Sequence, residues 1–199
     1  MQRALMLSAF LAAVGWVGNA LADSPQLKGP YGFTGSASCM ALRAPATFDP
    51  GTFEPLPPGP VPFGWKFNVE GIATFNGDGT GTVKASSMGF HHPALVPGAG
   101  SADLHYDFTY TVNDNSWTSE VVDPPGVIGT ETSGRRAGQA FKITNFPILS
   151  GLISKNASTL TAANLRPQVE NITYDNGDSF NRICHRSRVF IDLNPGRGQ

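Results

Sequence analysis

The sequence predicts an all-β protein built as one antiparallel up-and-down β-barrel of about eight to nine strands. Apolar and polar residues alternate along most of the chain after residue 22, which is typical of strands with one buried face. Clusters rich in Asn, Asp and Gly separate these segments and favour hairpin turns. No segment in that part shows the 3.6-residue period of an amphipathic helix. A sandwich is the alternative architecture for such a pattern.

Residues 1–22 have the three parts of a secretory signal peptide. Arg3 provides a positive charge, the stretch from Ala4 to Val17 is apolar, and Ala20-Leu21-Ala22 is a cleavage site of small residues. The apolar run is shorter than the roughly 20 residues that cross a bilayer. We therefore expect a secreted or periplasmic mature chain, a single domain over 23–199, with no transmembrane segment after cleavage.

The composition excludes two classes of protein. Charged residues make up 15% of the 199 residues and the net charge is −1, so no basic field is present to attract nucleic acid. Aromatic residues make up 10%, which gives the chain enough apolar surface to fold rather than stay disordered. The oligomeric state is left open by the sequence.

The segment from Ala102 to Val112 gives the clearest strand pattern. Its even-numbered residues, from Ala102 to Val112, have apolar or aromatic side chains, and its odd-numbered residues are Asp, His or Thr. The turn at 113–115 and the turns at 76–79 and 175–178 each separate two such segments. The predicted strands, in chain order, cover residues 31–39, 66–75, 80–87, 102–112, 117–122, 139–144, 149–154, 158–163, 168–174 and 179–193.

The two cysteines, Cys39 and Cys184, are predicted to form a disulfide, because their number is even and the chain is exported. Cys39 ends the first strand and Cys184 lies in the last strand, so the bridge would close the seam of a barrel. The patterns of the first and last strands give opposite indications of whether the bridge lies inside or outside the barrel. Cys39 shares its parity with Phe33, which indicates the interior.

Cys184 shares its parity with three arginines, and this makes the last strand hard to orient. Ile183, Val189 and Ile191 occupy the opposite parity, so we expect them to face the core and the arginines to face water. The bridge would then lie outside, with a bulge to reconcile the two strands. In the alternative orientation Arg182, Arg186 and Arg188 form an anion site inside the barrel.

Two long connections interrupt the strand pattern. Residues 44–63 are rich in proline but contain Phe48 and Phe53, so we expect them to pack on the barrel, as a lid over its mouth. Residues 123–138 are expected to be a mobile connection.

Aromatic residues on the inward parity are the candidate ligand-binding residues. Small barrels of about eight strands either fill their interior or hold one small ligand, and the sequence leaves both outcomes open. The candidates are Phe67, Phe75, Tyr106, Phe108, Tyr110, Trp117 and Phe141.

Catalytic and metal signals are weak. His105 and Asp107 share one face of a strand and could act as an acid–base pair, but that face alternates with an apolar one and is expected to be solvated. The four histidines lack the spacing of a metal site, so no metal and no cofactor is expected. Asn156 and Asn171 begin glycosylation sequons, which matter only in a eukaryote.

The segment Gly29–Gly35 (GPYGFTG), followed by a β-meander and a terminal disulfide, resembles the calycin-type barrels, which include the lipocalins. Residues Thr132–Gly138 (TSGRRAG) resemble the Gly-rich loop of allene oxide cyclase and dirigent-like barrels. The Gly-x-Trp signature of lipocalins is absent. The resemblance implies the fold, and no catalytic residue of these families is carried over.

These observations lead to one main functional hypothesis and two alternatives. The main hypothesis is an exported barrel that binds a small apolar or amphipathic ligand in its interior. The first alternative is an enzyme of the cyclase or isomerase type, and the second is a structural or interaction protein with a filled core.

Overall fold

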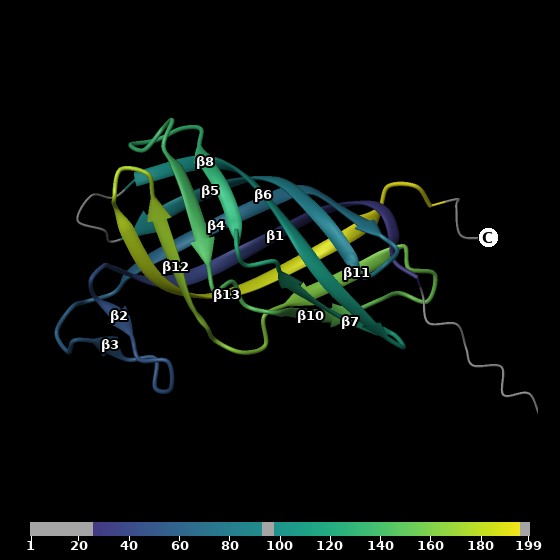
Figure 1. Ribbon diagram of the computed structural model, residues 1–199, viewed down its shortest axis with the longest axis horizontal. Coiled ribbons are helices and arrows are strands. Elements are labelled where there is room, and N and C mark those ends of the chain that lie inside the picture. Colours follow the sequence, from purple (N-terminus) through teal and green to yellow (C-terminus); the bar gives the residue numbers. More distant parts are fainter. Residues whose placement is uncertain (1–25, 93–97, 196–199) are drawn as a thin grey trace, which may run out of the picture.

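The computed structural model describes residues 26–92 and 98–195, and within these ranges it contains strands and no helix (Figure 1). The predicted signal peptide lies outside the described residues. The strands are β1 (Lys28–Arg43), β2 (Thr47–Phe48), β3 (Pro55–Leu56), β4 (Phe63–Asn76), β5 (Thr80–His92), β6 (Gly98–Asn113), β7 (Ser116–Val121), β8 (Val127–Glu131), β9 (Ala140–Thr144), β10 (Leu149–Leu152), β11 (Thr159–Ala163), β12 (Val169–Tyr174) and β13 (Ser179–Asp192).

Eleven strands form one antiparallel sheet that closes into a ring. The eight strands β1, β4, β5, β6, β8, β9, β12 and β13 follow one another around it in chain order, and β13 returns to β1. The other ends of β6 and β13 are joined by a second path of strands. This path runs through β7, β10 and β11 instead of β8, β9 and β12. The all-β class and the antiparallel strands are therefore confirmed.

The first and last strands meet along a long seam. Cys39 lies directly opposite Cys184 in the register of β1 and β13, and the two form a disulfide. Cys39 is 6% exposed and Cys184 is 2% exposed, so the bridge lies inside the ring. The expectation of a bridge on the outer surface is wrong, because Cys184 shares the inward parity of Phe180 and Phe190.

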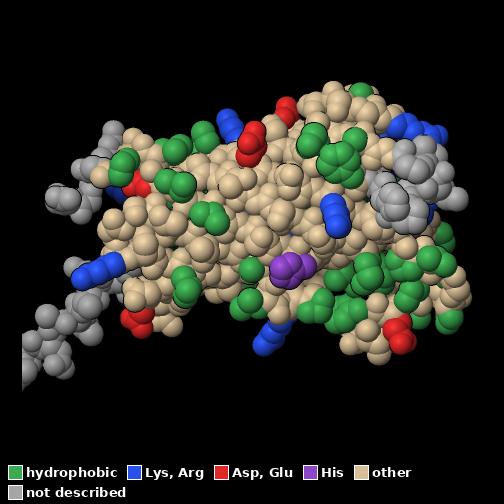
Figure 2. All heavy atoms as spheres, turned by 180° about the vertical axis from the view of Figure 1, so that it is seen from behind, with side chains coloured by type: hydrophobic (Ala, Val, Ile, Leu, Met, Phe, Trp, Pro, Cys, Tyr) green, Lys and Arg blue, Asp and Glu red, His purple; other side chains and the backbone are tan. Residues whose placement is uncertain are grey.

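Two loop expectations are also revised. Residues 127–131 of the expected mobile connection form β8, which pairs with β6 and β9. Residues 44–63 contain the β2–β3 hairpin, whose Phe48 packs with Leu42 and Ile183 in a small separate core. Ile183 has the outward parity of β13, so Phe48 of this hairpin packs on the outside of the ring. Figure 2 shows hydrophobic side chains gathered at this end of the molecule.

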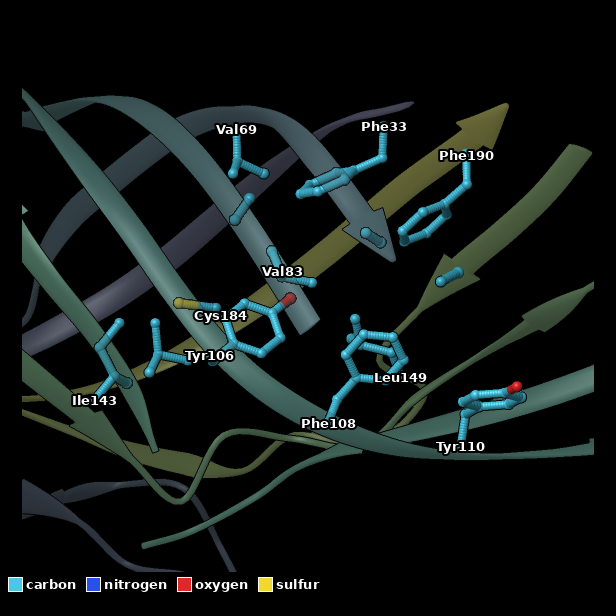
Figure 3. Close-up of a cluster of buried hydrophobic side chains, with 14 of the residues drawn as sticks. Phe33, Val69, Val83, Tyr106, Phe108, Tyr110, Ile143, Leu149, Cys184 and Phe190 are labelled. Atoms are coloured by element: carbon cyan, nitrogen blue, oxygen red, sulfur yellow. The ribbon is translucent and has the colours of Figure 1, made fainter. Parts of the chain in front are cut away.

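An aromatic cluster fills one part of the ring interior. Phe75 lies at its centre, and its ring centroid is 5.0–5.7 Å from those of four neighbours. The hydroxyl of Tyr110 donates to the carbonyl of Leu27 at 2.7 Å, and that of Tyr31 donates to the carbonyl of Ala157. Figure 3 shows part of this core. The aromatic cluster consists of Tyr31, Phe75, Phe108, Tyr110 and Trp117.

Among the described residues, no helix is both long and apolar enough to cross a membrane.

Candidate functional site

An arginine cluster occupies the other part of the ring interior. Arg182, Arg186 and Arg188 on β13 are 4%, 1% and 7% exposed. The expectation that they face water is wrong, whereas the alternative of inward-facing arginines agrees with the structure. Val189 and Ile191, which were expected to face the core, are 43% and 58% exposed. We use the name arginine cluster for Arg182, Arg186, Arg188 and their partner Glu170.

Glu170 gives two of these arginines a counter-charge. It lies on β12 directly opposite Arg182 and is fully buried. Its Oε2 accepts hydrogen bonds from Arg182 Nε at 3.0 Å and from Arg186 Nη2 at 2.5 Å, and its Oε1 forms an ion pair with Arg186 Nη1. One carboxylate thus binds two guanidinium groups in a dry environment, where such charge-assisted bonds are strong.

The ion pair of Glu170 and Arg186 persists at neutral pH. Burial alone would raise the pKa of Glu170, but the guanidinium groups of Arg186 and Arg182 outweigh burial and hold the pKa below its ordinary value. Burial lowers the pKa of Arg186 to about 10, although Glu170 opposes that change. Glu170 and Arg186 therefore both stay ionised at neutral pH.

Arg188 has no carboxylate partner in the arginine cluster. Its Nη1 donates to the hydroxyl of Tyr106 at 2.7 Å, and its guanidinium carbon lies 5.3 Å from the ring centre of Phe33. The ring of Phe146 lies between two arginines, 4.5 Å from the guanidinium of Arg186 and 5.8 Å from that of Arg188. These aromatic contacts hold the guanidinium planes in fixed orientations.

A cavity of about 80 Å³ lies against the arginine cluster. Three of the predicted ligand-binding residues, Phe67, Tyr106 and Phe141, line it. The three arginines form its charged wall. The remaining wall is mostly apolar and includes Val69, Leu104, Val127, Ile143, Phe146 and Ile172.

A larger hollow of about 980 Å³ adjoins this cavity at the end of the ring that holds the β12–β13 turn. The two spaces share the lining residues Trp65, Gly100 and Glu131, so they lie side by side. Prolines and Val61 of the segment after β3 form an apolar wall of the hollow. Asp178 on another wall pairs with Arg43 and Arg136.

Glu131 lies where the cavity and the hollow meet. Burial raises the pKa of its carboxyl group, and the hydrogen bond from the Tyr174 hydroxyl, at 2.8 Å, and the charge of Arg136 only partly oppose this. The Arg136 guanidinium lies 4.8 Å from the ring centre of Tyr174 and 4.9 Å from that of Phe180. The junction therefore has an acidic group flanked by aromatic rings and one arginine.

The other four predicted ligand-binding residues belong to the aromatic cluster. Phe75, Phe108 and Trp117 line a space of only about 20 Å³, and Tyr110 packs against Phe75 with 5.0 Å between ring centres. The structure thus divides the seven predicted ligand-binding residues into two groups. Three residues surround the cavity, whereas four pack against one another.

His105 and Asp107 are exposed on the outer face of β6. Their strand presents Tyr106 and Phe108 to the interior, so the pair does not line the cavity. The side chains of His91 and His92 lie outside the described residues. Within 26–92 and 98–195, no group of three His, Cys, Asp or Glu side chains is placed to hold a metal ion.

Glu170 and Phe146 were not predicted as site residues. Glu170 is a single acidic residue in a strand, and nothing in its neighbourhood marks it as buried. The arginines had a usable signal, because Phe180, Cys184 and Phe190 share their parity. Phe146 lies between β9 and β10, where the two-residue period is interrupted.

Comparisons with known proteins give no relative: no family model matches the chain, and no curated protein or solved structure matches it significantly.

Proposed function

We propose that this protein is an exported binding protein for a small amphipathic molecule, and that its closed ring is an up-and-down barrel of the calycin type. The observation that carries the proposal is the cavity beside the arginine cluster, which combines apolar walls with charged donors. Ligand pockets commonly have this combination of an apolar lining and a few converging polar groups. The disulfide between Cys39 and Cys184 is compatible with an oxidising compartment.

The dimensions favour a ligand that extends from the cavity into the hollow. A cavity of about 80 Å³ has room for only about five water-sized groups, so it holds one end of a molecule. The hollow provides the remaining space and apolar contacts with the proline-rich segment. The aromatic cluster, in contrast, is closed to a ligand because its rings fill the interior.

A neutral fluorescent probe, N-phenyl-1-naphthylamine, tests this proposal on the mature protein. We expect saturable fluorescence enhancement in the wild-type protein. Gly100→Trp places a large side chain where the cavity meets the hollow and should weaken binding at least tenfold. A Cβ at Gly100 has the carbonyl oxygen of Ser133 as its nearest neighbour, at 3.3 Å, so the backbone there has to shift by a few tenths of an ångström.

Thr109→Trp is the matched control, because Thr109 lies on the same strand but is exposed on its outer face. This variant should bind the probe like the wild-type protein. The proposal is wrong if the wild-type protein shows no saturable binding, or if both tryptophan variants bind the probe equally well.

A further inference from the structure

The buried charges of the arginine cluster do not balance. Three guanidinium groups, each at least nine-tenths buried, face one buried carboxylate, Glu170. Burying a charge without a partner is costly, and proteins ordinarily avoid it. The only carboxylate that lines the cavity among the described residues is that of Glu131, which accepts a hydrogen bond from Tyr174 and has Arg136 as its own neighbouring cation. The interior therefore carries an excess of positive charge beside an empty space.

The hydrogen bonds show the same imbalance. Glu170 binds Arg182 and Arg186 through its two oxygens, and Arg188 uses Nη1 for the hydroxyl of Tyr106. The Nε atoms of Arg186 and Arg188 are buried and have no hydrogen-bond partner among the described residues. A buried donor without an acceptor costs free energy, so an acceptor in the cavity would be favoured there. Both arginines line the cavity.

We infer that the cavity is an anion subsite that holds the carboxylate group of the amphipathic ligand. A carboxylate is planar, has two acceptor oxygens and matches the geometry of guanidinium groups. Its charge compensates part of the excess. The hydrocarbon part of the ligand then passes Trp65 and Glu131 into the hollow. This inference rests on the proposed function and adds the chemical class of the ligand.

The structure also indicates why a carboxylate would be chosen over a cation or a neutral group. Aromatic rings lie close to the guanidinium groups, with Phe146 beside Arg186 and Arg188, and the ring centre of Phe67 at 5.2 Å from Arg182. The free donors therefore lie at the edges of these groups, where an anion binds. A neutral hydroxyl offers less electrostatic energy, and an ammonium group would be repelled.

The test compares octanoate, 1-octanol and octylamine, three molecules with the same chain and different head groups. Binding to the mature, disulfide-bonded protein is measured by displacement of N-phenyl-1-naphthylamine. We expect octanoate to bind at least tenfold more tightly than 1-octanol, and octylamine to bind more weakly than both. Arg188→Met should weaken octanoate binding about tenfold, which corresponds to the loss of one bond to a charged group. It should weaken 1-octanol binding much less, because a neutral hydroxyl gains less electrostatic energy from the guanidinium group.

Arg166→Met is the matched control, since Arg166 is exposed and lies outside the cavity. It removes the same charge from the chain and should leave all three affinities unchanged. Near-ultraviolet circular dichroism verifies that each variant is folded. The comparison of octanoate with 1-octanol on the wild-type protein needs no variant at all, so a misfolded Arg188→Met does not prevent the test.

The outcomes separate this inference from the proposed function. If 1-octanol binds as tightly as octanoate, the anion subsite is wrong while the binding function stands. If acetate raises the melting temperature of the wild-type protein but not of Arg188→Met, and octanoate does not bind, the anion subsite is supported and the amphipathic ligand is wrong. If octanoate, 1-octanol, octylamine and acetate all fail to bind, the anion subsite and the proposed binding function are both wrong.

Discussion

The aromatic cluster and the arginine cluster lie inside the same ring of strands, but they differ in how completely their side chains fill the interior. Four rings pack around Phe75, and this cluster borders a space of only about 20 Å³. Around Glu170, the side chains leave about 80 Å³ and two buried donor atoms without partners. Close packing supports stability, whereas cavities and unpaired polar groups reduce it. The difference is in keeping with the proposal that the arginine cluster binds a ligand, while the aromatic cluster stabilises the fold.

The largest effect should come from Glu170→Gln. The substitution leaves Arg182 and Arg186 buried without their carboxylate, which should lower the free energy of unfolding by about 4 kcal/mol at pH 7. Urea unfolding followed by tryptophan fluorescence measures it. Because the folded pKa of Glu170 is lowered, its contribution is present above its unfolded pKa and is lost as the pH falls through the folded value. The variant should therefore lose less stability on acidification below about pH 4.3.

A small effect of Glu170→Gln would contradict the view that the two arginines depend on this carboxylate. Thr173→Ala is a suitable control, since Thr173 is an exposed residue of the same strand. Its effect should stay within about 0.5 kcal/mol.

Phe75→Ala tests the aromatic cluster and should have the next largest effect. It removes a fully buried ring that contacts four others and leaves a cavity, at a cost of about 3 kcal/mol. The urea midpoint should fall, while the octanoate affinity of the protein that remains folded should not change. If octanoate affinity fell as strongly as stability, the two clusters would not be separate in function.

Hydrophobic alternation predicted most of this structure but misled at the last strand. It identified every strand of the eleven-stranded sheet except β8, and the inward aromatic residues, whereas the pairing of Cys39 with Cys184 followed from their even number in an exported chain. On β13, exposed Val189 and Ile191 looked like the core face, because alternation does not distinguish a buried arginine from a solvated one. Two of these arginines pair with Glu170, which is brought opposite Arg182 only by the pairing of β12 with β13.

The loops were the other limit of the sequence. Residues 127–131 lie between two segments rich in Gly, Pro and Ser, so their short apolar stretch was hidden, and only its partners on β6 and β9 define β8. The cavity could not be predicted from the sequence either. Its volume is set by how Phe146 and the guanidinium groups pack together, and that is a property of the tertiary structure.

Glu131→Gln should give a smaller effect with the opposite dependence on pH. Burial raises the pKa of Glu131 in the folded protein, so its ionisation lowers stability as the pH rises from its unfolded to its folded pKa. The wild-type protein should lose some stability over this window, just above the ordinary glutamate pKa, and the variant should not. Urea unfolding at several pH values between 4 and 7 measures this. An identical pH profile for both proteins would contradict the burial of this carboxyl group.

The smallest effect should come from His105→Ala combined with Asp107→Ala. Both side chains are exposed on the outer face of β6, away from both clusters, so the free energy of unfolding should change by less than about 0.5 kcal/mol for each. Octanoate affinity should also stay the same, because neither residue lines the cavity or the hollow. Displacement of N-phenyl-1-naphthylamine measures it. A tenfold loss of affinity would show that the outer face takes part in binding. Binding would then not be confined to the arginine cluster inside the ring.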